Sequence, residues 1–157
     1  MHDTLKIRAA TQRDLADILA LYMHLSPEDA PLDERKAKVI FQSFEHYAGS
    51  RIFIGLLDKA VVSSCALVVV PNLTRSGTPY ALIENVVTDT GFRKRGFGRA
   101  VLAAAVAAAW DAGCYKVMLL AGSKSPAILS FYENSGFSQN KTGFQIRRKA
   151  VRPEQAL

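Results

Sequence analysis

The segment at residues 91–101, GFRKRGFGRAV, contains three glycines and four cationic side chains. An alternating apolar pattern precedes it, and an alanine-rich helical pattern follows it. The N-terminus of a helix offers unpaired N–H groups and a partial positive charge, which attract anions. Gly96 and Gly98 would let a phosphate approach those amides without obstruction from a Cβ atom. The cations that would surround the phosphate are Arg93, Lys94, Arg95 and Arg99.

The glycines do not follow the common nucleotide-binding spacings. A dinucleotide fingerprint needs a third glycine at position 101, and a Walker loop ends in Gly-Lys-Ser/Thr; neither is present. A solvated turn and a nucleic-acid contact are the two other interpretations of this segment. Proteins that bind single strands interleave exposed aromatic rings with their cations, and only Phe92 and Phe97 lie near. We expect both rings to anchor the turn in the core.

The remaining pattern is Arg-x-x-Gly-x-Gly at residues 93–98. It follows the run IENVVTDTGFR at 83–93, and further patterns lie downstream, KVMLL at 116–120 and AILSFYENSGF at 127–137. Together these segments resemble the GNAT N-acetyltransferase superfamily, whose cofactor signature is [Gln/Arg]-x-x-Gly-x-[Gly/Ala]. The resemblance is strong over residues 80–137 and implies acetyl-CoA as co-substrate, with no metal.

The resemblance also implies where acetyl-CoA would lie. Its pantetheine arm would pair with the backbone of Val86 and Val87, in a wedge where the fourth and fifth strands separate. Its pyrophosphate would lie on the amides of residues 94–99. Ser125 stands where many members have an asparagine that contacts the cofactor, although capping a helix is the alternative role. The cofactor-binding residues expected are Val86, Val87, Arg93, Lys94, Arg95, Gly96, Phe97, Gly98, Arg99 and Ser125.

Acetyl transfer to an amine needs a base for the ammonium and benefits from an acid for the leaving thiolate. Glu84 is the only acidic residue in the apolar run from Tyr80 to Val87, so it is the candidate base. Alternation along a strand places it with Leu82 and Val86, so we expect a buried carboxylate; an exposed strand glutamate is the alternative. The resemblance implies Tyr132 as the acid, with a packing role as the alternative. Asn85 stands where the amino-sugar branch has aspartate, which leaves the acceptor open.

The elements that position these residues follow from periodicity and turn signals. Strands are predicted at 5–10, 51–57, 60–70, 81–88 and 116–121, with one or two closing strands in 136–148. Helices are predicted after Thr11, in 32–48, at 96–112 and at 126–134, and Thr11 with Asp14 resembles a capping box. The order predicts a mixed α/β fold with an antiparallel front half and a right-handed parallel crossover between the fourth and fifth strands. The resemblance implies a central mixed sheet of six to seven strands, four helices on both faces, and a splayed parallel pair.

Bulk properties set the remaining expectations. The chain has 157 residues and a net charge of +6, which suits an anionic ligand. We expect one domain over residues 1–150 and a tail at 151–157. Cys65 and Cys114 are expected to be buried free thiols, and His2, His24 and His46 to be structural or solvent-facing. The first residues lack a signal peptide's apolar core, and no apolar run reaches the length of a membrane span, so a cytoplasmic location is expected.

These observations predict an acetyl-CoA-dependent N-acetyltransferase that uses direct transfer in a ternary complex. The acceptor is a small-molecule amine or a protein lysine, and a homodimer is possible. Neither a membrane nor a nucleic acid is expected as a partner. A non-catalytic acyl-CoA-binding or regulatory module on the same fold is the alternative, and nucleic-acid binding through the basic loop is more remote.

Overall fold

The computed structural model describes residues 4–148, so the predicted tail at 151–157 lies outside the described residues. Within these residues the chain forms two compact units, divided between Leu119 and Leu120. The single domain expected over residues 1–150 stays a prediction.

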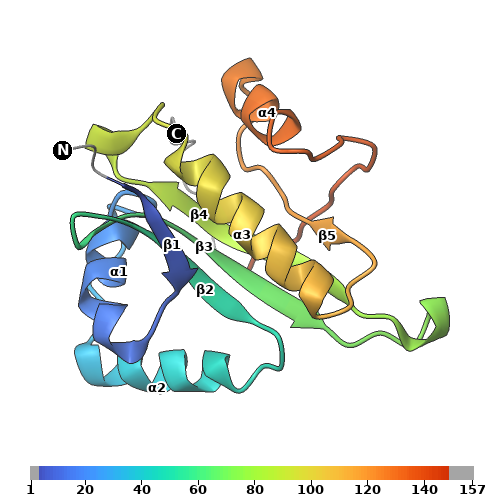
Figure 1. The fold of residues 1–157 in the computed structure, drawn as a ribbon, viewed down its shortest axis with the longest axis horizontal. Helices are drawn as coiled ribbons and strands as arrows, with labels where there is room; N and C mark the ends of the chain where they lie inside the picture. Colours follow the sequence, from blue (N-terminus) through green and yellow to red (C-terminus); the bar gives the residue numbers. More distant parts are fainter. Residues whose placement is uncertain (1–3, 149–157) are drawn as a thin grey trace. The chain divides into compact units, whose positions relative to one another are not determined.

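The first unit is built on a five-stranded sheet in the order β1-β2-β3-β4-β5 (Figure 1). The first four strands are antiparallel neighbours, and β5 pairs with β4 in parallel, which confirms the predicted topology. The strands are β1 (Lys6–Ala9), β2 (Arg51–Leu57), β3 (Ala60–Val70), β4 (Tyr80–Thr88) and β5 (Val117–Met118). The α-helices are α1 (Leu15–Tyr22), α2 (Glu34–Glu45), α3 (Phe97–Asp111) and α4 (Pro126–Glu133). Short 3-10 turns lie at Gln12–Asp14, Arg75–Gly77 and Thr90–Phe92.

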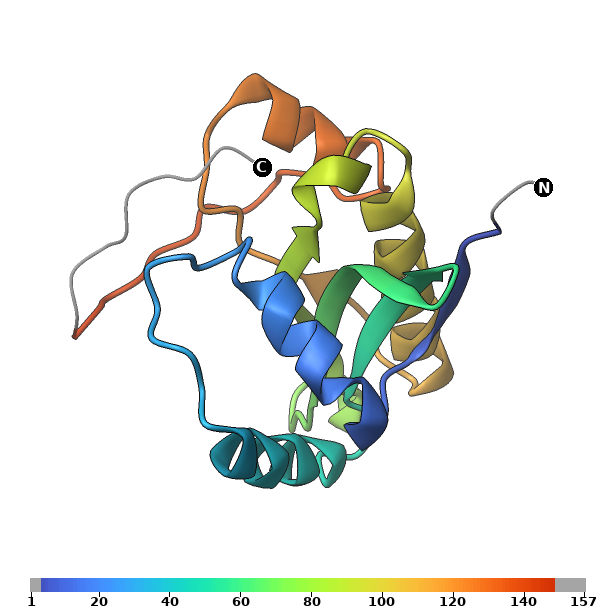
Figure 2. The same ribbon diagram turned by 90° about the vertical axis from the view of Figure 1, so that its left-hand side faces the viewer.

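Helices cover both faces of the sheet, as Figure 1 and Figure 2 show for α1 and α3. On one face, Leu15 of α1 and Ala37 and Phe41 of α2 form a buried cluster. On the other face, the Cys65 thiol of β3 lies 3.5 Å from the carbonyl oxygen of Val101 in α3. Successive residues of β3 point to opposite faces, so this central strand contributes to both halves of the core.

The hairpin between β2 and β3 has the predicted two-residue turn. Asp58 and Lys59 have φ values of +48° and +75°. Positive φ at both positions is the mark of a type I′ turn, whose twist matches that of the flanking strands. Local turn chemistry therefore sets the start of β3.

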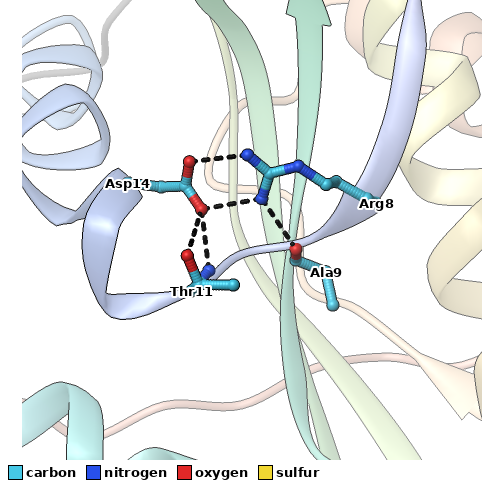
Figure 3. A network of polar contacts seen from close by, with 4 residues as sticks. All are labelled: Arg8, Ala9, Thr11 and Asp14. Atoms are coloured by element: carbon cyan, nitrogen blue, oxygen red, sulfur yellow. Dashed lines mark hydrogen bonds and ion pairs between the residues drawn. The ribbon is translucent and has the colours of Figure 1, made fainter.

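The start of α1 is held by a polar network on Asp14 (Figure 3). Both carboxylate oxygens accept from Arg8, at 2.7 Å each, and Oδ2 also accepts from the Thr11 amide at 2.8 Å. The Arg8 hydrogen bonds lower the pKa of Asp14 to about 2, with further help from Thr11, and they outweigh the opposing effect of burial. The capping box predicted at Thr11 and Asp14 is confirmed, with a 3-10 turn between it and α1.

The expected sheet of six to seven strands is wrong in its count. Within residues 4–148 the sheet has five strands, and no strand forms between 136 and 148. The side chains of Phe144 and Ile146 are 90% and 100% exposed, respectively. Alternation alone does not make a strand, because the backbone also needs a neighbour to complete a hydrogen-bonded ladder. Of the predicted strand at 116–121, only Val117–Met118 is paired.

Among the helices of residues 4–148, none combines the length and apolar character that crossing a membrane requires.

Candidate active site

A β-bulge interrupts β4 beside the candidate base. Ala66 of β3 lies opposite Glu84, but Ser64 lies opposite Val87, so β4 carries one extra residue between these pairs. Asn85 takes up the extra length with φ of +52°, a left-handed conformation that asparagine tolerates better than most residues.

The bulge corrects the expectation for Glu84. Residues paired across two strands lie on one face, so Val87 rather than Val86 shares the face of Glu84. The extra residue ends the strict alternation. Glu84, which was expected to be buried, is exposed, and Asn85 beside it is also exposed. The structure therefore agrees with the alternative interpretation, an exposed strand glutamate, and Glu84 lies next to the β-bulge.

One edge of β4 is open next to the bulge. The parallel pairing with β5 covers only Ala81 and Leu82, so within residues 4–119 the edge from Ile83 to Thr88 has no partner strand on that side. This edge includes the backbone of Val86 and Val87. An extended ligand with amide groups can add to such an edge as an extra strand would.

The loop after β4 is ordered by its own side chains. Asp89 accepts from the Gly91 amide at 2.8 Å, and Nε of Arg93 donates to the Thr88 carbonyl at 3.3 Å. The guanidinium of Arg95 lies over the rings of Phe92 and Phe97, at 5.5 and 4.9 Å from their centroids.

The two phenylalanines of this loop have the predicted anchoring role. Phe97 is buried with Leu57 and Val62, and Phe92 packs against this cluster. Their rings therefore fix the path of the loop instead of being offered to a ligand.

The loop ends at the N-terminus of α3, where the predicted anion site lies. Gly96 is the N-cap, with φ of +82°, and no atom lies within 4 Å of the position that a Cβ would take. The Ala100 amide donates to the Gly96 carbonyl, so helix geometry leaves the amides of residues 97–99 without an acceptor inside the helix. Lys94 and Arg99 are exposed beside these amides in sequence. The arrangement can bind a phosphate group.

Ser125 and Tyr132 belong to α4 in the second unit. The Ser125 hydroxyl accepts from the Ile128 amide at 3.4 Å, so it caps the helix, as the alternative interpretation has it. Tyr132 is half-buried and meets Phe131 and Phe137 edge-on, at centroid separations of 5.0 and 6.3 Å. These ring contacts fix the orientation of the tyrosine. The contact of Ser125 with the cofactor and the acid role of Tyr132 stay predictions.

Sequence reasoning missed one contact of the loop between β4 and α3. Nε2 of His24, just after α1, lies 3.6 Å from a carboxylate oxygen of Asp89. Both side chains are about one-third exposed. No local pattern joins residues so far apart in the chain, so this contact had no signal in the sequence. The two cysteines, in contrast, are free and buried as predicted.

Residues 15–137 match the model of the acetyltransferase (GNAT) family. A glucosamine 6-phosphate N-acetyltransferase of Trypanosoma brucei brucei is 33% identical over 152 residues, which cover 90% of this chain and 95% of that protein. Glucosamine 6-phosphate N-acetyltransferase 1 of Oryza sativa subsp. japonica is 30% identical, over 79% of this chain and 77% of its own. A solved structure, a putative acetyltransferase from Agrobacterium tumefaciens str. C58, is 47% identical with a TM-score of 0.86, over 91% of this chain and 99% of its own. Sequence and fold agree, and this chain belongs to the GNAT family of acetyltransferases.

Proposed function

We propose that this protein transfers the acetyl group of acetyl-CoA to a primary amine of a small molecule, directly and within a ternary complex. The observation that carries the proposal is the bulge in β4. Next to it the Glu84 carboxylate is exposed on a strand with an open edge, and the same strand leads to the N-terminus of α3, the proposed anion site. A base, an edge for an extended ligand and a phosphate site therefore follow one another along the chain.

The described residues suit coenzyme A. The open edge at Val86 and Val87 offers backbone groups to the amides of pantetheine. The space in front of Gly96 leaves room for a pyrophosphate on the amides of α3, with Lys94 and Arg99 adding charge. Arg93 and Arg95 of the loop, Phe97 and Gly98 at the start of α3, and Ser125 are proposed as further parts of the cofactor site. Acetyl-CoA, when bound, supplies an acetyl group activated as a thioester.

The protein's own groups would move two protons. The Glu84 carboxylate would accept the proton that the acceptor's ammonium must lose before its nitrogen can attack. The Tyr132 hydroxyl would donate a proton to the departing thiolate. Exposure of Glu84 supports this assignment, because a base must meet an acceptor that enters from solvent.

The acceptor to test first is glucosamine 6-phosphate, the substrate in the names of the two relatives. Asn85 is neutral where the amino-sugar branch carries an aspartate, so one negative charge beside the ammonium is missing. We therefore propose a panel that extends from amino sugars to aminoalkyl compounds, polyamines and lysine peptides.

The test is the release of the coenzyme A thiol, detected with a thiol reagent. The protein's own thiols are poor competitors, because both are buried; burial raises the pKa of Cys65 to about 12 and that of Cys114 in the same direction. We expect Glu84→Gln to lower kcat by about 100-fold without changing the affinity for coenzyme A. Glu45→Gln, at an exposed glutamate on α2, is the matched control.

Three outcomes would change the proposal. A full rate for Glu84→Gln at neutral pH would remove this residue as the base. Coenzyme A binding in calorimetry, with no turnover over the whole panel, would favour the non-catalytic module. Binding to random oligonucleotides that weakens with salt and is not competed by coenzyme A would favour a nucleic-acid contact. A cytoplasmic location and a homodimer stay predictions, and sedimentation of the purified protein tests the dimer.

A further inference from the structure

Two buried hydroxyl groups lie together without a hydrogen-bond partner. They are the phenol of Tyr22, the last residue of α1, and the hydroxyl of Ser64 in the middle of β3. Neither has a partner of full hydrogen-bonding geometry among residues 4–148. A buried hydroxyl without a partner is costly, so native proteins seldom leave one unpaired.

The surroundings of Ser64 are apolar on both sides. Its partners across the sheet are Ile54 of β2 and Val87 of β4, and both of these side chains are fully buried. Alanine or valine at position 64 would suit such a site better than serine does. The hydroxyl therefore needs a polar partner, and the nearby Tyr22 hydroxyl is the polar group that the described residues place beside it.

The hydroxyl pair lies behind the β4 bulge. Ser64 is paired with Val87, and the next pair on the same face is Ala66 with Glu84. Ser64 and Glu84 are thus diagonal neighbours on one face; in a regular sheet such residues are about 7–8 Å apart, and their Cβ atoms somewhat less. One water molecule can bridge a hydroxyl and a carboxylate over that range.

The Tyr22 hydroxyl is protonated and able to donate. Burial raises its pKa, and the nearby Ser64 hydroxyl opposes this effect only in part. Even if the two hydroxyls shift to bond each other, one of their two O–H donors still lacks an acceptor. An internal water would complete the bonding of both groups, as buried waters commonly do.

We propose that Tyr22 and Ser64 hold an internal water molecule behind the β4 bulge, and that this water positions the Glu84 carboxylate for proton transfer. The inference rests on the proposed function of Glu84 as the base. Tyr22 and Ser64 are positioning residues, since they act on the acceptor only through the water and Glu84.

The kinetic test uses Tyr22→Phe, Ser64→Ala and the double variant. We expect each single variant to lower kcat about tenfold, with the KM for acetyl-CoA unchanged, because the carboxylate loses its alignment. The double variant should be no slower than the worse single variant, since all three lose the same water. Ser50→Ala is the control: Ser50 is equally buried, but its hydroxyl accepts from the Val69 amide at 2.9 Å. This control should lower the Tm and leave kcat unchanged.

The structural test is a crystal structure of the wild-type protein at a resolution that shows ordered water. We expect a water within hydrogen-bonding distance of both Tyr22 Oη and Ser64 Oγ, absent from the double variant. No water at this position, or variants with a raised Tm and an unchanged kcat, would overturn the inference.

The two proposals fail in different ways. If the wild type acetylates no amine, the proposed function fails, and the crystal structure and the Tm values still decide whether the water site exists. If the wild type turns over and Ser64→Ala keeps its kcat, only the positioning role fails.

Discussion

Two glycines that flank α3 allow the proposed phosphate site to be tested with a matched pair of variants. Gly96 lies at the N-terminus of the helix with φ of +82°, and Gly113 lies just after its C-terminus with φ of +78°. Neither has an atom within 4 Å of the position of a new Cβ. Alanine at either position therefore meets backbone strain and no steric clash in the protein.

The strain should cost about the same at both ends. A left-handed conformation costs an L-residue about 1–2 kcal/mol, partly offset by the lower entropy of the unfolded chain, so we expect a net loss of about 1 kcal/mol. For a chain of this size, that loss lowers the Tm by about 2–4 °C.

The effect on coenzyme A should differ sharply between the two variants. At Gly96 the new methyl group would stand where the phosphate approaches the amides of α3. Losing one hydrogen bond to a charged group costs about 1.5–3 kcal/mol, which weakens binding about 10- to 100-fold. Gly113→Ala should bind coenzyme A as the wild type does.

Calorimetry with coenzyme A and thermal unfolding of both variants make the comparison. Equal losses of Tm together with unchanged affinity in both variants would refute the phosphate site, and Gly96 would then be a turn residue only.

Two further predictions concern stability. Because the folded-state pKa of Asp14 lies at about 2, below its ordinary value of 3.8, the stability that this carboxylate contributes is present above about pH 4 and is lost as the pH falls towards 2. The side chain of Arg8 is 44% exposed, so we expect the carboxylate to contribute about 1–2 kcal/mol to the free energy of unfolding. In urea unfolding, the free energies of the wild type and Asp14→Asn should differ by this amount at pH 6 and converge near pH 2. A difference that stays constant with pH would contradict the assignment. At the bulge, Asn85→Gly should keep the unfolding free energy within about 0.5 kcal/mol, whereas Asn85→Val should lower it by about 2 kcal/mol, because a β-branched residue tolerates positive φ poorly. Equal stability of the two Asn85 variants would show that the bulge does not depend on this residue.

Features of the fold that depend on local patterns could be predicted from the sequence. The strands at 51–57 and 60–70 match their predicted bounds, because alternation and a two-residue turn act within a few residues. The loop before α3 was likewise recognisable, since glycines, cations and the helix start are all adjacent. The anchoring of Phe92 and Phe97 followed from their apolar character alone.

Features that depend on register could not be predicted in this way. Val87 rather than Val86 shares the face of Glu84 because β4 has an extra residue opposite Cys65, and an alternation rule assumes that no such residue exists. Asn85 was a weak signal of the bulge in the sequence, because asparagine is uncommon in strands and tolerates positive φ. The prediction of closing strands in 136–148 was wrong for a related reason. Alternation describes one strand, but it does not show whether a neighbouring strand is present to pair with it.

The bulge links the errors of the sequence-based interpretation to the proposed chemistry. A regular β4 would have placed Glu84 and Val86 on one face, with the carboxylate among apolar neighbours. The extra residue instead places Val87 on the face of Glu84 and beside Ser64, where the hydroxyls of Ser64 and Tyr22 have no partner of full hydrogen-bonding geometry among residues 4–148. The proposed base therefore lies next to the irregularity, and the proposed water site lies behind it.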